Sequence, residues 1–207
     1  MSNQEQTVTS HVHKDPIASK MGMWIFLFTE LLLFGGLFIA YSVYRYLHHE
    51  EFHQAAMQMN TLLGTLNTII LLTSSMTMAL SIAAIQRGKR ILSIILQAVT
   101  ILFGAAFLVN KFIEWSAEFA HGNYPGSPEL LAKNSGEILY FGLYYTMVGL
   151  HGLHVIVGMT VIAFTMVFTI RNTINKDDFV KLENAGLYWH LVDIIWIFLF
   201  PLFYLIT

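Results

Sequence analysis

The sequence has no cysteine and few charges, and these two deficits exclude several classes of protein. Without cysteine the chain cannot form disulfides, thiolate zinc sites or iron–sulfur clusters, and it has no thiol nucleophile. Charged residues make up 12% of its 207 residues, whereas soluble domains carry about 25%. Apolar residues make up 56%, and the net charge of −2 does not favour nucleic acid as a partner. The composition is that of a membrane protein.

Five long apolar runs predict an all-α integral membrane bundle. A helix needs about 20 apolar residues to cross a hydrocarbon layer of roughly 30 Å. The runs are apolar at odd and even positions alike, which excludes the alternation of transmembrane strands. The expected spans are 21–47, 62–85, 91–113, 138–170 and 186–206. Residues 1–20 are polar and predict a tail, so that 21–207 would form a single transmembrane domain.

Lysine and arginine are distributed unequally between the two ends of these spans. If the spans alternate in direction, eight of the eleven basic residues lie on the side of the N-terminus. The positive-inside rule then predicts a cytoplasmic N-terminus, or a matrix one in an organelle, and a periplasmic or extracellular C-terminus. Most acids outside the spans lie on the opposite side, so we expect that outer face to be anionic.

Ionisable side chains inside the spans are the candidate functional residues, because a charge at the centre of a membrane helix costs about 2.5–3.5 kcal/mol. Glu30 lies in the first span, where it is either a proton-active carboxylate or a neutral acid hydrogen-bonded within the bundle. His151 and His154 are three apart in the string GLHGLHVIVG, so they share a helix face. Haem or metal ligation is disfavoured, because no other span has a central histidine. We expect hydrogen bonds between helices instead, including one to Glu30.

Two further pairs of ionisable residues are also spaced three apart. His190 and Asp193 in the fifth span are expected to form an ion pair or a hydrogen bond on one helix face. Lys111 and Glu114, at the outer end of the third span, are expected to form an interfacial ion pair. None of these patterns predicts a catalytic centre or a metal site in this chain.

Four strings of the sequence carry a resemblance to a known family: MGMWIFLFTELLLFGGLFIAY, TLNTIILLTSS, GLHGLHVIVG and YWHLVDIIWIFLF. Taken together, they resemble subunit III of the haem–copper terminal oxidases, in its short five-helix bacterial form. The strings lie on four of the five spans and follow the order of the family. Lys111 departs from the family pattern, because a glutamine often stands at that position, three residues before the glutamate.

The resemblance implies a non-catalytic subunit without a redox cofactor, whose partner subunits I and II hold the haem and copper. It implies a two-helix group and a three-helix group that form a V-shaped cleft filled by phospholipid. It further implies that the chain stabilises subunit I and supports proton uptake in a bacterial inner membrane, with Glu30 as the intramembrane carboxylate of the family. Cytochrome c is the expected electron donor, since some quinol-oxidase relatives resemble this chain with aspartate in place of Glu30.

Three alternatives remain open from the residues. The chain is similar to subunit III of quinol oxidases as well. An independent proton-coupled transporter would use Glu30, His151, His154 and Asp193 as a relay. A membrane cytochrome would hold haem on the paired histidines. The last two classes predict proton flux or a Soret band from the chain purified alone, whereas an accessory subunit predicts neither.

Overall fold

The computed structural model describes residues 16–205, and this part of the chain is helical, without strands. Five of its helices are long and apolar enough to cross a membrane, which confirms the all-α, five-span prediction. The fifteen N-terminal residues of the expected tail lie outside the described part, and residues 16–20 belong to the first helix. The helices are α1 (Pro16–Leu47), α2 (His49–Ala56), α3 (Thr61–Gln86), α4 (Arg90–Ala120), α5 (Pro128–Leu131), α6 (Ser135–Ile170) and α7 (Val180–Tyr204).

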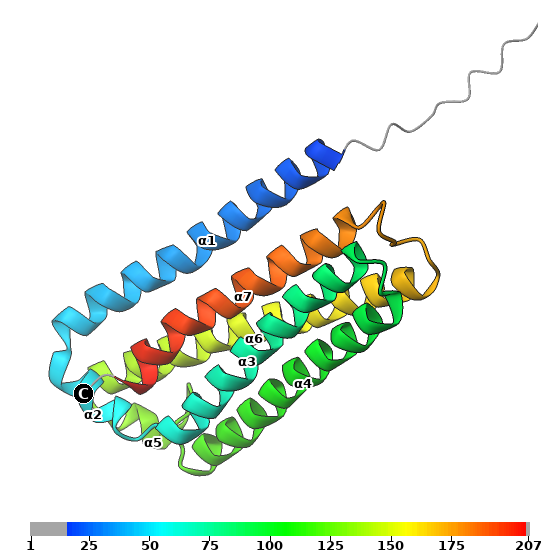
Figure 1. Ribbon diagram of the computed structural model, residues 1–207. Coiled ribbons are helices and arrows are strands. Elements are labelled where there is room, and N and C mark those ends of the chain that lie inside the picture. Colours follow the sequence, from blue (N-terminus) through cyan, green and yellow to red (C-terminus); the bar gives the residue numbers. More distant parts are fainter. Residues whose placement is uncertain (1–15, 206–207) are drawn as a thin grey trace, which may run out of the picture.

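Four of the spans form a bundle, and α1 lies along one side of it (Figure 1). Helix α3 packs against α4 and α7, and α6 packs against the same two helices, while α1 contacts α6 and α7. The expected two-helix group consisted of the first two spans. The structure corrects this division, because the second span, α3, packs in the bundle with α4 and α7. The reason is the buried polar side of α3, where Asn67, Ser74 and Ser81 face the interior.

Close contacts between glycine and tryptophan bring the bundle helices together. A Cβ atom on Gly158 of α6 would lie 2.7 Å from the ring of Trp189, and one on Gly104 of α4 would lie 2.9 Å from the same ring. The indole nitrogen of Trp189 donates to the Ser74 hydroxyl at 2.7 Å. One fully buried tryptophan of α7 therefore contacts α3, α4 and α6.

Helix α1 is attached through a narrow seam. Leu27, Phe34 and Tyr41 are buried at a spacing of seven residues, which keeps them on one face of the helix. In the most apolar window of α1 only 11% of the residues are buried, compared with 50% in α7. A Cβ atom on Gly35 or Gly36 would meet nothing within 4 Å. Most of the α1 surface therefore faces away from the rest of this chain.

The last turn of α7 is tied to other helices by side-chain donors. The Tyr41 hydroxyl of α1 donates to the Leu202 carbonyl at 2.5 Å, and the Tyr140 hydroxyl of α6 donates to the Phe203 carbonyl at 2.7 Å. Carbonyls at a helix C-terminus have no partner within their own helix, so these two hydroxyls satisfy them in an apolar setting.

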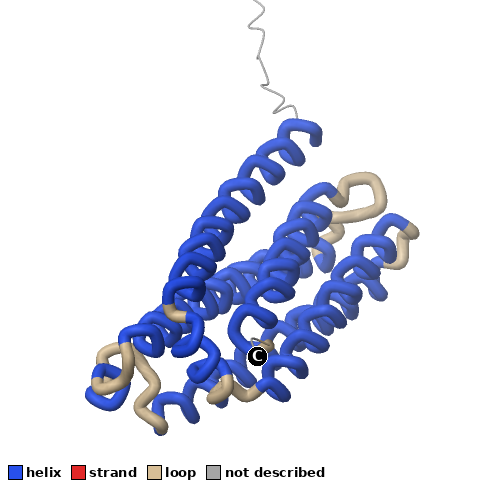
Figure 2. Tube along the Cα trace, turned by 90° about the vertical axis from the view of Figure 1, so that its left-hand side faces the viewer, coloured by secondary structure: helices blue, strands red, loops and turns tan. Residues whose placement is uncertain are grey.

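Two short helices cover the end of the bundle where α1 ends, and loops connect the spans at both ends (Figure 2). Helix α2 was not expected from the apolar runs. Its Phe52 is fully buried and packs edge-on against the rings of Tyr41 and Tyr140.

Helix α4 continues to Ala120, well beyond its expected end at residue 113. Gly122 and Gly126, with φ of 73° and 91°, then turn the chain towards α5.

Candidate functional site

Glu30 and His154 form a pair between α1 and α6, as expected from the sequence. Glu30 Oε2 lies 2.9 Å from His154 Nε2, and the two side chains are 16% and 12% exposed. Glu30 is near the middle of α1, so the pair lies well inside the span. The Phe34 ring packs edge-on against the imidazole, and the Tyr188 ring stacks on it. The pair therefore sits among aromatic rings between the bundle and α1.

The hydrogen bonds of His154 fix the number of protons held by this pair. Its Nδ1 lies 2.7 Å from the Leu150 carbonyl, which can only accept, so Nδ1 carries a proton. The hydrogen bond between Nε2 and Glu30 then contains one proton, held either by the carboxyl or by the imidazole. Moving that proton interconverts a neutral pair and an ion pair without rearranging any heavy atom.

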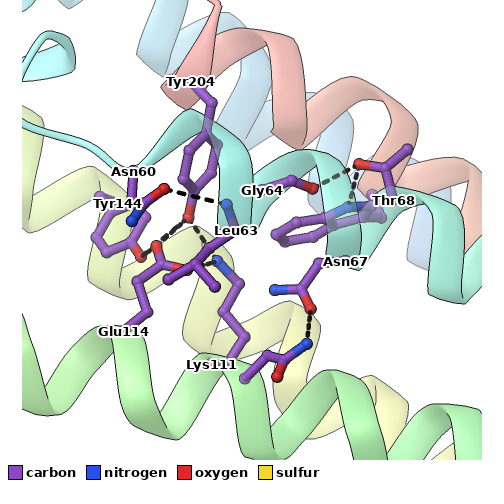
Figure 3. Close-up of polar contacts among 11 residues, drawn as sticks. Asn60, Leu63, Gly64, Asn67, Thr68, Lys111, Glu114, Tyr144 and Tyr204 are labelled. Atoms are coloured by element: carbon purple, nitrogen blue, oxygen red, sulfur yellow. Dashed lines mark hydrogen bonds and ion pairs between the residues drawn. The ribbon is translucent and has the colours of Figure 1, made fainter.

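Lys111 and Glu114 form the second acid–base pair, but inside the bundle (Figure 3). Lys111 Nζ lies 2.9 Å from Glu114 Oε2 and 2.5 Å from the Tyr204 hydroxyl. Both Tyr144 and Tyr204 donate to Glu114 Oε1, the former at 2.6 Å. The two charged side chains are only 7% and 3% exposed. The expected pair is therefore formed, and it is buried where it joins α4 to α6 and α7.

Aromatic rings complete the surroundings of the Lys111 ammonium group. It lies 4.7 Å from the ring centroid of Trp196 and 4.8 Å from that of Tyr204. A cation over an aromatic face is stabilised by the ring quadrupole, and more strongly where water is excluded. With a carboxylate, a hydroxyl and two rings as partners, this buried lysine is well compensated.

The third expected pair, His190 with Asp193, is not formed. His190 Nδ1 instead lies 2.6 Å from the Ser75 hydroxyl of α3. Asp193 is 3% exposed, and neither of its carboxyl oxygens has a hydrogen-bond partner among the described residues. Ser75 lies beside Asp193 as well. The spacing of three placed both residues near α3, but α3 supplies a partner only for His190.

His151 is separated from the pair formed by His154. It is fully buried, and its ring packs against Phe107 and Trp196, with no hydrogen-bond partner at either nitrogen among the described residues. The two histidines therefore do not converge on a common ligand. Over residues 16–205 the structure contains no group of three histidine, aspartate or glutamate side chains able to hold a metal ion.

Three polar partners in these sites were not foreseen. Tyr144, Tyr204 and Ser75 lie on other helices than the residues that they bond. Their only signal in the sequence is a polar group within an apolar span. Interhelical packing decides which of those groups face an ionisable side chain.

The sequence of the chain was compared with known proteins and protein families. Residues 3–207 match the family described as Cytochrome c oxidase subunit III. The chain belongs to that family. It is 32% identical to the cytochrome c oxidase subunit 3 of Thermostichus vulcanus, over 95% of this chain and 92% of that one.

Members with other names are similar to a comparable degree. The chain is 29% identical to the cytochrome bo(3) ubiquinol oxidase subunit 3 of Pseudomonas aeruginosa, over 94% of this chain and 88% of that one. It is also 29% identical to the haem–copper oxidase subunit I+III of Aeropyrum pernix, over 93% of this chain and 23% of that one. This subunit III is therefore a multi-pass membrane component of a haem–copper oxidase complex.

Proposed function

We propose that this chain is the non-catalytic subunit III of a proton-pumping cytochrome c oxidase in a bacterial inner membrane. It stabilises subunit I, assembles with subunits I and II, which hold the haem and copper, and supports proton uptake. The observation that carries the proposal is the Glu30–His154 pair. Such a pair holds one mobile proton inside the span, at the junction between the peripheral helix and the bundle.

The location of the pair suits a role in proton supply. Ionisable groups within membrane spans are costly, and they commonly mark proton pathways. The unequal distribution of Lys and Arg supports a cytoplasmic N-terminus and an outer C-terminus. In that orientation α1 runs from the proton-uptake side of the membrane towards Glu30.

Phospholipid binding is supported by a groove between α1, α6 and α7. This groove has a volume of about 330 Å³ and is lined mainly by apolar side chains, among them Met23, Phe26 and Val161. Lys181 and Asn184 line the same groove near the start of α7. An acyl chain would lie along the apolar wall, with the headgroup near Lys181.

The electron donor is the least constrained part of the proposal. Relatives named as cytochrome c oxidase and as quinol oxidase subunits match at 32% and 29% identity. Oxygen consumption by the purified complex, measured separately with reduced cytochrome c and with a reduced quinol, distinguishes the two. We expect turnover with cytochrome c; turnover with quinol alone would assign the chain to a quinol oxidase.

The variant Glu30→Gln in the assembled oxidase tests the role in proton supply. A carboxamide keeps a hydrogen bond to His154 but cannot release a proton. We expect an unchanged haem spectrum, a lower oxygen-consumption rate at alkaline pH and faster inactivation during turnover. Glu50→Gln, a change at an acid that is 83% exposed on α2, is the matched control and should behave as the wild type.

Two results would contradict this role. Turnover that is unchanged by Glu30→Gln at every pH would leave the pair as a packing contact. Proton flux or a Soret band from the chain purified without its partners would instead favour a transporter or a cytochrome.

A further inference from the structure

The turn between α3 and α4 concentrates positive charge at one end of the bundle. Arg87, Lys89 and Arg90 lie within four residues, and the first two are exposed. The Lys–carboxylate ion pairs of the described residues involve other cations, namely Lys20, Lys111 and Lys133. The sequence thus concentrates three cations here, and these ion pairs do not include them.

A groove of about 730 Å³ begins at this turn and changes character along its length. Gly88, Lys89 and Arg90 line one part of it. Ile91 and Ile95 of α4 line another part and are 75% and 53% exposed. The groove therefore joins a cationic mouth to an apolar wall of exposed side chains.

Arg90 gives the mouth of the groove a fixed position. Its Nε donates to the Thr169 carbonyl at 2.8 Å, and its Nη2 donates to the Ile170 carbonyl. These bonds hold the guanidinium group between the start of α4 and the end of α6, and they do not use Nη1. Gly88 has φ of 72°, and a Cβ atom there would meet nothing within 4 Å. An anion can therefore approach the backbone of the turn closely.

We propose that this groove binds an anionic phospholipid, with its phosphate at Lys89 and Arg90 and one acyl chain along Ile91 and Ile95. Charge complementarity selects the headgroup, because basic clusters at the ends of membrane helices attract anionic lipids. The apolar wall selects a lipid over a free phosphate. The site is separate from the groove beside α1, and it does not rest on the proton-supply role of Glu30.

The first arm of the test uses the wild-type oxidase complex, delipidated in mild detergent. Native mass spectrometry measures the binding of added phosphatidylglycerol and phosphatidylcholine. We expect tighter binding of phosphatidylglycerol, weakened by raising the NaCl concentration. Dihexanoyl phosphatidylglycerol should bind more weakly than the long-chain lipid, and millimolar inorganic phosphate should not displace the long-chain lipid.

The second arm locates the site with charge-removing variants. Each basic residue near an anionic group contributes roughly 1 kcal/mol, or about fivefold in affinity. Lys89→Gln removes one of the two cations placed at the phosphate and should therefore weaken binding of one phosphatidylglycerol about fivefold. Lys176→Gln is the matched control, because Lys176 is exposed in the α6–α7 loop at the same end of the bundle but precedes Asp177 and Asp178. Its binding should stay within about twofold of the wild type.

Several outcomes would overturn the proposal. Equal binding of the two lipids, displacement by inorganic phosphate or an equal loss in Lys176→Gln would each do so. Equal binding would exclude a headgroup preference, and displacement by phosphate would exclude a contribution of the apolar wall. An equal loss in Lys176→Gln would exclude this groove as the binding site. Unchanged binding of phosphatidylglycerol by Lys89→Gln would overturn the location as well.

Discussion

Helix α1 and the four-helix bundle differ in how closely their helices pack against the rest of the chain. Several glycines of the bundle lie against neighbouring side chains: a Cβ atom on Gly158 would come within 2.7 Å of Trp189. Glycines of α1 face open space, as at Gly35 and Gly36. The bundle therefore depends on close packing within the chain, whereas α1 keeps a large surface for lipid or for the rest of the complex.

The two acid–base pairs follow the same division. The Lys111–Glu114 pair is nearly inaccessible and is held by hydroxyls from α6 and α7. The Glu30–His154 pair is more exposed, and the Glu30 carboxylate has His154 as its bonded partner. A buried, fully bonded pair suits a structural role, whereas a peripheral pair with one shared proton can change state at lower cost.

The largest expected effect is loss of the Glu114 carboxylate. Glu114→Leu leaves the Lys111 ammonium buried without a counter-charge, so we expect a loss of about 3–5 kcal/mol in the free energy of unfolding. Lys111→Met should cost about 1–3 kcal/mol, because both tyrosines still donate to Glu114. The Lys111→Met/Glu114→Leu double variant should be more stable than Glu114→Leu alone. Unfolding in mixed detergent micelles measures all three, and equal stability of all three variants would refute the structural role of the pair.

Close packing in the bundle can be tested with two glycines of the same helix. Gly158→Ala forces a methyl group against the rigid Trp189 ring, so we expect a cost of about 1–3 kcal/mol. Gly152→Ala meets nothing within 4 Å and should leave stability unchanged or raise it by up to about 1 kcal/mol. Thermal unfolding of the solubilised chain compares them. Similar midpoints for the two variants would contradict the close contact at Trp189.

A double-mutant cycle sharpens the comparison between the two pairs. The Glu30→Ala and His154→Ala variants should give a coupling energy of about 0.6 kcal/mol, the average measured for polar contacts between membrane helices, and no more than the maximum of about 1.7 kcal/mol. The coupling between Lys111 and Glu114 should be larger, because it includes the cost of an uncompensated buried charge. A larger coupling for the α1 pair would reverse the proposed division of roles.

The smallest expected effect concerns the open face of α1. Gly36→Ala should change the stability of the isolated chain by no more than about 1 kcal/mol, since the new methyl group has no neighbour. Co-purification with the other oxidase subunits is the second measurement. Normal stability combined with poorer co-purification would indicate that another helix packs closely on this face in the complex.

The sequence predicts the five spans well, because a helix that crosses the membrane needs an apolar run of about 20 residues. It does not predict α2, because that helix has only eight residues, and its buried Phe52 depends on rings from α1 and α6. The Glu30–His154 contact follows from the cost of burying either group alone. The pairing of His190 with Ser75 does not follow, since helical spacing identifies a face but not the neighbour that it meets.

The sequence does not predict the burial of Lys111 either. Its spacing from Glu114 predicts the contact, but the surroundings come from Tyr204, which is distant along the chain. Likewise the association of α3 with the bundle depends on its buried side, which includes Asn67, and on its neighbours in α4 and α7. The sequence shows which residues share a face of one helix. It does not show which residues of another helix that face contacts.

The bond from the Tyr41 hydroxyl to the Leu202 carbonyl has a consequence for biogenesis. It connects the first of the five described spans with the final turn of the fifth. This bond can therefore form only after α7 has been synthesised, later than the contacts of α1 with α2 and α6. A chain truncated before α7 would lack this closing bond, so that α1 would be held by its contacts with α2 and α6 alone.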